Sequence, residues 1–180
     1  MSCKLKVQDD GRTPINLLER TVTQTHAMTD THHHAHLIAS YRATCYQAQT
    51  PHGLLRIRIG EPCADLHLLL EEQGATEWAF ISAYNPHSRP LKHTENQARH
   101  QQLLMELATR GLTFFEGEGI PDEPGWEPER SALILDISLE SACSLAQRFD
   151  QNAIVAGRLG RPATLVWCVS SRPVHTSGKE

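Results

Sequence analysis

The sequence lacks the short motifs that mark many catalytic and cofactor sites. It contains no Gly-x-Gly-x-x-Gly, no phosphate-binding loop, no Gly-x-Ser-x-Gly and no Cys-x-x-Cys. These absences argue against standard nucleotide cradles, against a serine nucleophile in its usual setting and against a cysteine zinc site. We therefore predict no cofactor and no metal centre, and the pattern leaves enzymatic activity undecided.

Long apolar runs and an excess of positive charge are also missing. No stretch approaches the roughly 18 apolar residues of a membrane span, and the first residues hold no apolar core of a secretion signal. The formal net charge of −4 disfavours nucleic acid as a partner. The five cysteines are widely spaced, as in reduced intracellular proteins. We expect a cytoplasmic protein that contacts no membrane.

The length and composition indicate one globular domain. The chain has 180 residues, of which 39% are hydrophobic and 21% charged, within the range of a single domain with its own core. We predict a poorly ordered extension over 1–28, one α/β domain over 29–169 and a flexible tail over 170–180. The histidine-rich stretch 26–36 has no acidic partner motif, so no metal is assigned to it.

Hydrophobic periodicity and turn residues predict alternating helices and strands. We expect a first helix over 30–40, a hairpin of strands 41–47 and 54–59, and a helix from Pro62 to Gly74. A strand then covers 78–84. Thr94 and Gln97 form a capping box for a helix that runs to Gly111. The remaining predictions are a strand over 112–116, a long loop over 116–131, a strand over 132–137, a helix capped by Ser138, and strands over 153–155 and 164–168.

The element order from residue 76 onward is strand, helix, strand, strand, helix, strand. This is the ferredoxin-like split βαβ order. We therefore predict an α+β fold with a ferredoxin-like core, to which the N-terminal β-hairpin and its helix are added. The alternative is an α/β doubly wound fold with a parallel sheet, because helices alternate with strands in the middle of the chain.

Polar residues gather where the strand over 78–84 ends and the next helix begins. They are Asn85, Ser88, Glu95, Asn96 and Arg99. Free backbone N–H groups at a helix start attract anions, and Arg99 can present a planar fork to a carboxylate or phosphate. The structural alternative is an Asn-Pro turn, a helix cap and a surface pair between Glu95 and Arg99.

Two further segments are candidates for the same site. The long loop carries an isolated Trp126 with Glu118 and Glu129, and long loops often act as lids or binding loops. Gln151 and Asn152 precede an apolar strand, where two amides can recognise a ligand or a partner backbone. The structural alternatives are a loop stiffened by prolines, with Trp126 packed as its small core, and a polar end to the preceding helix.

The motifs Ala83-Tyr84-Asn85-Pro86-His87-Ser88-Arg89-Pro90-Leu91, Glu95-Asn96-x-x-Arg99, Gly117-Glu118-Gly119, Trp126, Glu129-x-Ser131 and Gln151-Asn152-Ala153-Ile154-Val155 resemble a bacterial family. It is the family known as domain of unknown function 3293, and the likeness covers roughly residues 38–168. Asp150 stands where the family has glycine, and aspartate also tolerates a left-handed turn. The resemblance implies these boundaries and motif residues, but no activity.

Two functional hypotheses follow from these residues. The first, which we favour, is a non-catalytic domain that binds a small ligand or a protein partner. The second is an enzyme for a small anionic substrate, in which Arg99 holds the anion, a glutamate moves the proton and Trp126 closes the site. The second requires a buried carboxylate beside Arg99, with a shifted pKa.

Overall fold

The computed structural model describes residues 34–123 and 125–168. Two compact units divide the chain between Ile38 and Ala39, and every strand described below belongs to the second unit. The predicted extension over 1–28, the tail over 170–180 and most of the histidine-rich stretch lie outside the described residues. In the described part, no helix has both the length and the apolar character needed to cross a bilayer.

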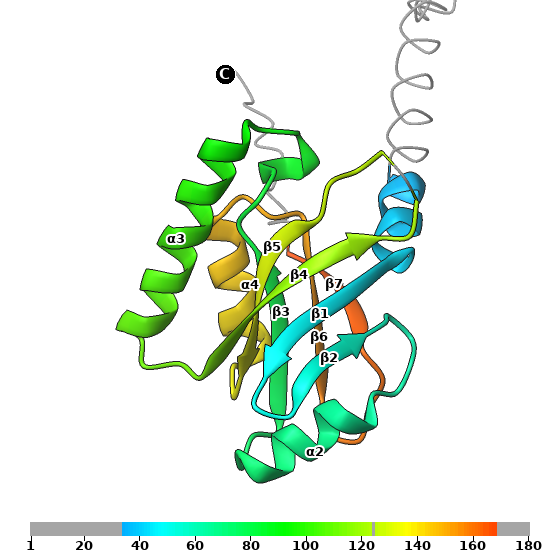
Figure 1. The fold of residues 1–180 in the computed structure, drawn as a ribbon, viewed down its shortest axis with the longest axis vertical. Helices are drawn as coiled ribbons and strands as arrows, with labels where there is room; N and C mark the ends of the chain where they lie inside the picture. Colours follow the sequence, from blue (N-terminus) through cyan, green and yellow to red (C-terminus); the bar gives the residue numbers. More distant parts are fainter. Residues whose placement is uncertain (1–33, 124, 169–180) are drawn as a thin grey trace, which may run out of the picture. The chain divides into compact units, whose positions relative to one another are not determined.

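The second unit is built on one seven-stranded sheet in which the paired strands are antiparallel. The strand order is β2-β1-β4-β5-β3-β6-β7 (Figure 1). The strands are β1 (Thr44–Thr50), β2 (Gly53–Ile57), β3 (Glu77–Ser82), β4 (Phe114–Pro121), β5 (Glu129–Leu135), β6 (Ala153–Arg158) and β7 (Thr164–Trp167). The α+β prediction is confirmed. The doubly wound alternative is wrong, because that fold requires parallel neighbours.

The helices cover both faces of the sheet. They are α2 (Ala64–Glu72), α3 (His93–Thr109) and α4 (Leu139–Arg148), and residues 34–42 are also helical. Alternate residues of β3 point to opposite faces, as the pleat requires. Ala79 and Ile81 pack with α3 and α4, whereas Trp78 and Phe80 pack with α2 and the β1–β2 hairpin. The sheet therefore separates two hydrophobic cores, one on each face.

Several predicted boundaries shift in the structure. Residues 41 and 42 are helical and β1 begins at Thr44, so the strand predicted from residue 41 starts too early. Helix α3 begins at His93 with Lys92 as its N-cap, so the Thr94 cap is wrong. Instead, the Glu95 carboxylate accepts the Lys92 N–H at 3.1 Å. The Ser138 cap of α4 is confirmed, because its hydroxyl accepts the Ser141 N–H at 3.2 Å.

The long loop predicted over 116–131 is wrong. Strand β4 continues to Pro121 and β5 starts at Glu129, so the connection between the paired strands shortens to residues 122–128. The cause is Gly117, which we interpreted as a loop residue. A Cβ atom at this position would lie 2.1 Å from the Gln47 carbonyl oxygen and 2.9 Å from the Phe80 ring. Glycine thus permits the close approach of β4 to β1.

We expect Gly117→Ala to lower the free energy of unfolding by about 2 kcal/mol or more, because the added methyl must displace backbone of β1. Urea denaturation measures this change. The matched control is Gly119→Ala on the same strand, whose Cβ would meet its nearest neighbour at 3.4 Å. We expect the control to change stability by less than about 1 kcal/mol. Equal effects of the two substitutions would contradict the steric explanation.

Candidate functional site

The turn between β3 and α3 is held in an unusual backbone conformation. Asn85, His87 and Ser88 have left-handed φ values of 47°, 54° and 57°. Non-glycine residues rarely adopt this region, and such strain often gathers at functional sites. The His87 N–H donates to the Asp150 carbonyl at 2.8 Å, which ties the turn to the segment after α4. Asp150 itself has φ 56°.

Asn85 and Asn96 lock the turn to the start of α3. The Asn85 N–H donates to Asn96 Oδ1 at 2.9 Å, and Asn96 Nδ2 donates to Asn85 Oδ1 at 2.8 Å. Asn85 Oδ1 also accepts the Leu91 N–H at 3.0 Å. Asn96 is only 5% exposed, and these bonds meet the requirement that buried amides be paired. The position of the Asn85 side chain is therefore set by α3.

Glu129, at the start of β5, completes a cluster with Asn85, Asn96 and Trp126, called the Glu129 cluster below. Asn85 Nδ2 donates to Glu129 Oε1 at 2.7 Å, and Trp126 Nε1 donates to the same oxygen at 3.0 Å. Among the described residues, no hydrogen bond reaches Oε2. Burial raises the pKa of the Glu129 carboxyl, and the two hydrogen bonds oppose that shift. Trp126 is 44% exposed, so the cluster has an aromatic face open to solvent.

Three tyrosine hydroxyls lie within electrostatic reach of the Glu129 carboxyl. Burial raises the pKa values of Tyr41, Tyr46 and Tyr84, and the negative charge of Glu129 adds a smaller rise to each. The Tyr46 hydroxyl donates to the Tyr41 carbonyl at 3.0 Å. Burial thus places the carboxyl of Glu129 in a setting where its charged form is costly.

Arg99 lies in a second network, whose bonds go to the protein itself. Its Nε donates to the Ala83 carbonyl at 2.8 Å, and its Nη2 donates to the Phe149 carbonyl. Nη2 also lies 3.4 Å from the Asp150 carboxylate. A guanidinium committed to two carbonyls joins the end of β3 to the end of α4. This placement favours a bracing role over an anion clamp.

The network around Arg99, called the Arg99 brace below, also contains Gln151, Asn152 and Ser88. Gln151 Nε2 donates to the Tyr84 carbonyl at 2.8 Å, and Asn152 Nδ2 donates to Ser88 Oγ at 3.0 Å. The two amides therefore connect the start of β6 to the β3–α3 turn.

Two predicted site residues lie apart from these networks. Glu95 is exposed, and its carboxylate accepts the Lys92 N–H at the start of α3. Glu118 lies on β4, between Arg130 of β5 and Gln47 of β1 in the strand register. Its side chain has no hydrogen bond or ion pair within the described ranges. The surface pair expected between Glu95 and Arg99 does not form, because Arg99 turns toward Ala83 and Phe149.

Sequence reasoning missed His100. It is fully buried on α3, its Nε2 lies 3.4 Å from Glu116 Oε2, and its ring meets Tyr84 edge-on with centroids 6.2 Å apart. Glu116 is held in turn by Arg130 at 2.6 Å. Burial lowers the pKa of His100, against the opposing effect of Glu116. Its helical spacing from Asn96, Leu103 and Leu107, the other buried residues of α3, was the available signal.

Within the described ranges, no group of three or more His, Cys, Asp or Glu side chains could hold a metal ion. His34 and His36 are described, and the remaining histidines of the 26–36 stretch lie outside the described residues. The site thus consists of the half-buried Glu129 carboxyl, the amides of Asn85 and Asn96 and the exposed Trp126 indole, at one end of the antiparallel sheet.

The residues of this site lie in a segment that matches a known family model. The family model described as "Protein of unknown function (DUF3293)" matches residues 81–154. The resemblance indicated by the motifs is therefore confirmed over this segment, which is shorter than the 38–168 expected. This segment contains the Glu129 cluster and the Arg99 brace. No match was found among curated proteins or among solved structures.

We expect Arg99→Ala to lower the free energy of unfolding by about 2–3 kcal/mol, because carbonyls at Ala83 and Phe149 lose a charged donor. Urea denaturation provides the measurement. Arg89→Ala is the control, since Arg89 is exposed in the same turn. An Arg99→Ala protein as stable as the control would show that the arginine is free for a ligand.

We also expect acid to destabilise the protein through His100. Its pKa is lower in the folded than in the unfolded state, whose ordinary value is 6.5, so unfolding takes up a proton and stability falls as the pH drops below about 6.5. The slope for one such group is at most about 1.4 kcal/mol per pH unit.

Urea midpoints measured between pH 7.5 and 5 test this expectation. His100→Gln should reduce the slope, whereas His93→Gln, an exposed position on the same helix, should leave it unchanged. An unchanged slope in His100→Gln would contradict the assignment to His100.

Proposed function

We propose that the protein is a non-catalytic binding domain whose recognition site is the Glu129 cluster. The ligand is a small molecule or a protein segment that presents an N–H or ammonium group to Glu129 Oε2. The observation that carries the proposal is the arrangement of donors on Glu129: Asn85 and Trp126 both occupy Oε1. Such a fixed carboxylate is a pre-oriented acceptor, which reduces the entropic cost of binding.

The exposed indole of Trp126 supports the same proposal. Its Nε1 is committed to Glu129, which fixes the orientation of the ring while 44% of the residue remains exposed. An oriented aromatic face beside a carboxylate suits a cationic or planar ligand, which can stack on the ring while its N–H bonds the acid. The Arg99 brace supports the site indirectly, by holding the β3–α3 turn.

The burial of Glu129 supports a functional reason for keeping an acid there. Its pKa is raised by burial, so the ionised form costs stability near neutral pH. A glutamine would accept the same two hydrogen bonds at no such cost. Residues that are retained against stability often serve binding or catalysis.

The alternative function is an enzyme that uses Glu129 as the acid or base. The raised pKa of Glu129 favours it, because a carboxyl with a raised pKa exchanges protons closer to neutral pH. The anion clamp of this alternative, Arg99, is bonded to two carbonyls, so an anionic substrate would need another cation. Turnover that is lost in Glu129→Gln would establish this alternative.

Further assignments accompany the proposal. The strand order β4-β5-β3-β6 with two helices on one face supports a ferredoxin-like split βαβ core, to which β1, β2 and α2 are added. The free thiols of Cys45, Cys63, Cys143 and Cys168 support a reducing, cytoplasmic location. A bacterial origin follows from the family resemblance and stays a prediction.

We expect Glu129→Gln to separate stability from binding. The wild-type carboxyl has a raised pKa in the folded state, so its contribution to stability is lost as the pH rises from 4.5, its ordinary value, through the folded pKa. The glutamine lacks this loss, so at pH 7 the variant should be as stable as the wild type or more stable. Binding should fall, because the negative charge and the free Oε2 acceptor are gone.

Thermal-shift titration with amines, amino acids, nucleotides and basic peptides measures both properties. A ligand at 100 times its Kd adds about 2.7 kcal/mol to the wild type. The matched control is Glu127→Gln, at an exposed position two residues before Glu129. This variant should bind as the wild type does. A ligand that binds Glu129→Gln and wild type equally well would exclude the Glu129 cluster as its site.

A further inference from the structure

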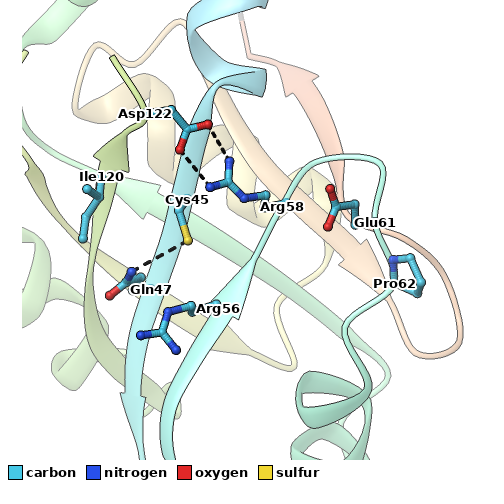
Figure 2. A pocket seen from close by; sticks show the side chains of 8 residues that line it. All are labelled: Cys45, Gln47, Arg56, Arg58, Glu61, Pro62, Ile120 and Asp122. Carbon is cyan, nitrogen blue, oxygen red and sulfur yellow. Dashed lines mark hydrogen bonds and ion pairs between the residues drawn. The ribbon is translucent and has the colours of Figure 1, made fainter. Parts of the chain in front are cut away.

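A second site lies on the half of the sheet formed by β1, β2 and β4, on the face of the hairpin opposite to α2. Cys45 and Gln47 of β1, Arg56 of β2 and the residues that follow β2 and β4 enclose a cavity of about 450 Å³ (Figure 2). Of its lining residues, only Ile120 and Asp122 fall within the family match over 81–154, and the cavity shares no residue with the Glu129 cluster. Sequence analysis did not indicate it, because its residues come from three separate segments.

Charge pairing inside the cavity leaves one cation free. Arg58 donates two hydrogen bonds to the Asp122 carboxylate, from Nη1 at 2.7 Å and Nη2 at 2.8 Å. This pair neutralises both groups and fixes one wall. The Arg56 side chain makes no hydrogen bond or ion pair with any described residue. Figure 2 shows Glu61, the other carboxylate, on the far side of Arg58 from Cys45 and Gln47.

Arg56 and Gln47 are direct cross-strand partners, so their side chains project from the same face of the sheet. Gln47 Nε2 lies 3.8 Å from Cys45 Sγ, which directs the amide donors into the cavity. Pairing with β1 fixes the backbone of Arg56 on one side. The Arg56 carbonyl also accepts a hydrogen bond from the Cys63 thiol at 3.2 Å. A guanidinium fork beside an amide N–H matches the oxygens of a carboxylate or phosphate.

We infer that this cavity binds a small oxyanion, a carboxylate or phosphate group, through the Arg56 guanidinium and the Gln47 amide. The Arg58–Asp122 pair shapes the wall without adding net charge. The site is independent of the proposed function, because it involves neither Glu129 nor Trp126. The structure offers a built-in reporter for it: Cys45, 8% exposed, lines the cavity.

Thermal unfolding in malonate, phosphate or chloride at matched ionic strength provides the test. We expect malonate, phosphate or both to raise Tm of the wild type above its value in chloride. Arg56→Gln should abolish the rise. Arg161→Gln, which removes the same charge from an exposed position outside the cavity, should preserve it. Arg56→Lys should retain only part of it, because lysine lacks the planar fork.

The outcomes separate the possible ligands and the possible failures. A response to phosphate alone identifies a phosphate site, and a response to malonate alone identifies a carboxylate site. An equal response in Arg56→Gln, or no response in the wild type, overturns the inference. A response that survives in Glu129→Gln shows that this site stands apart from the proposed function.

Thiol modification then locates the anion. Modification of Cys45 by an anionic methanethiosulfonate should exceed that by a cationic one by about tenfold, through electrostatic steering. Peptide mass spectrometry measures this ratio, with the half-buried Cys143 of α4 as the internal reference. The preference should disappear in Arg56→Gln, and the anion that raises Tm should protect Cys45 but not Cys143. Protection that is equal at both cysteines, or unchanged in Arg56→Gln, would contradict the location.

Discussion

The mutual pairing of two asparagine amides, Asn85 and Asn96, is the interaction on which the site depends. Four polar groups in the crowded space between the end of β3 and the start of α3 must find partners, and the two amides satisfy one another. This pairing fixes the left-handed turn and directs the remaining Asn85 donor toward Glu129. Without this pairing, the two asparagine amides would lose partners in a partly buried site. The Asn85 amide would then no longer be held against the Glu129 carboxyl, so both groups would be destabilised together.

The two candidate sites lie on different halves of the sheet. The central strands β3 and β5 are buried on both faces and give the unit its rigidity. At one end of these strands, the chain leaves β3 through the strained β3–α3 turn. The Glu129 cluster lies there, between this turn and the start of β5. On the other half, β1, β2 and β4 present an uncovered polar face with the Arg56 cavity. The two sites therefore rest on one scaffold but share no side chain.

Several features of the site were predictable because they depend on neighbours in sequence. Asn85, Asn96 and Arg99 gather near one helix start in the sequence, and the structure brings Glu129 and Trp126 to Asn85 there. The roles of individual residues were less predictable. Arg99 donates to carbonyls that only the packing of α3 against β3 and α4 brings within reach, and Glu95 remains a helix cap. His100 escaped notice, since a single histidine on a helix gives no local sign that its face is buried.

The sequence alone determined the α+β class, the buried stripe of α4 and its Ser138 cap, because each follows from a local period or a backbone donor three residues away. Tertiary structure decided the rest. Gly117 belongs to a strand because β4 lies against β1 some 70 residues away in the chain, a pairing with no local signature. The pairing of β5 with β3 brings Glu129 to Asn85. In the second site, Arg56 meets Gln47 within the local β1–β2 hairpin, but the pairing of β4 with β1 brings Asp122 to Arg58. Strand pairing between distant segments therefore completes both candidate sites.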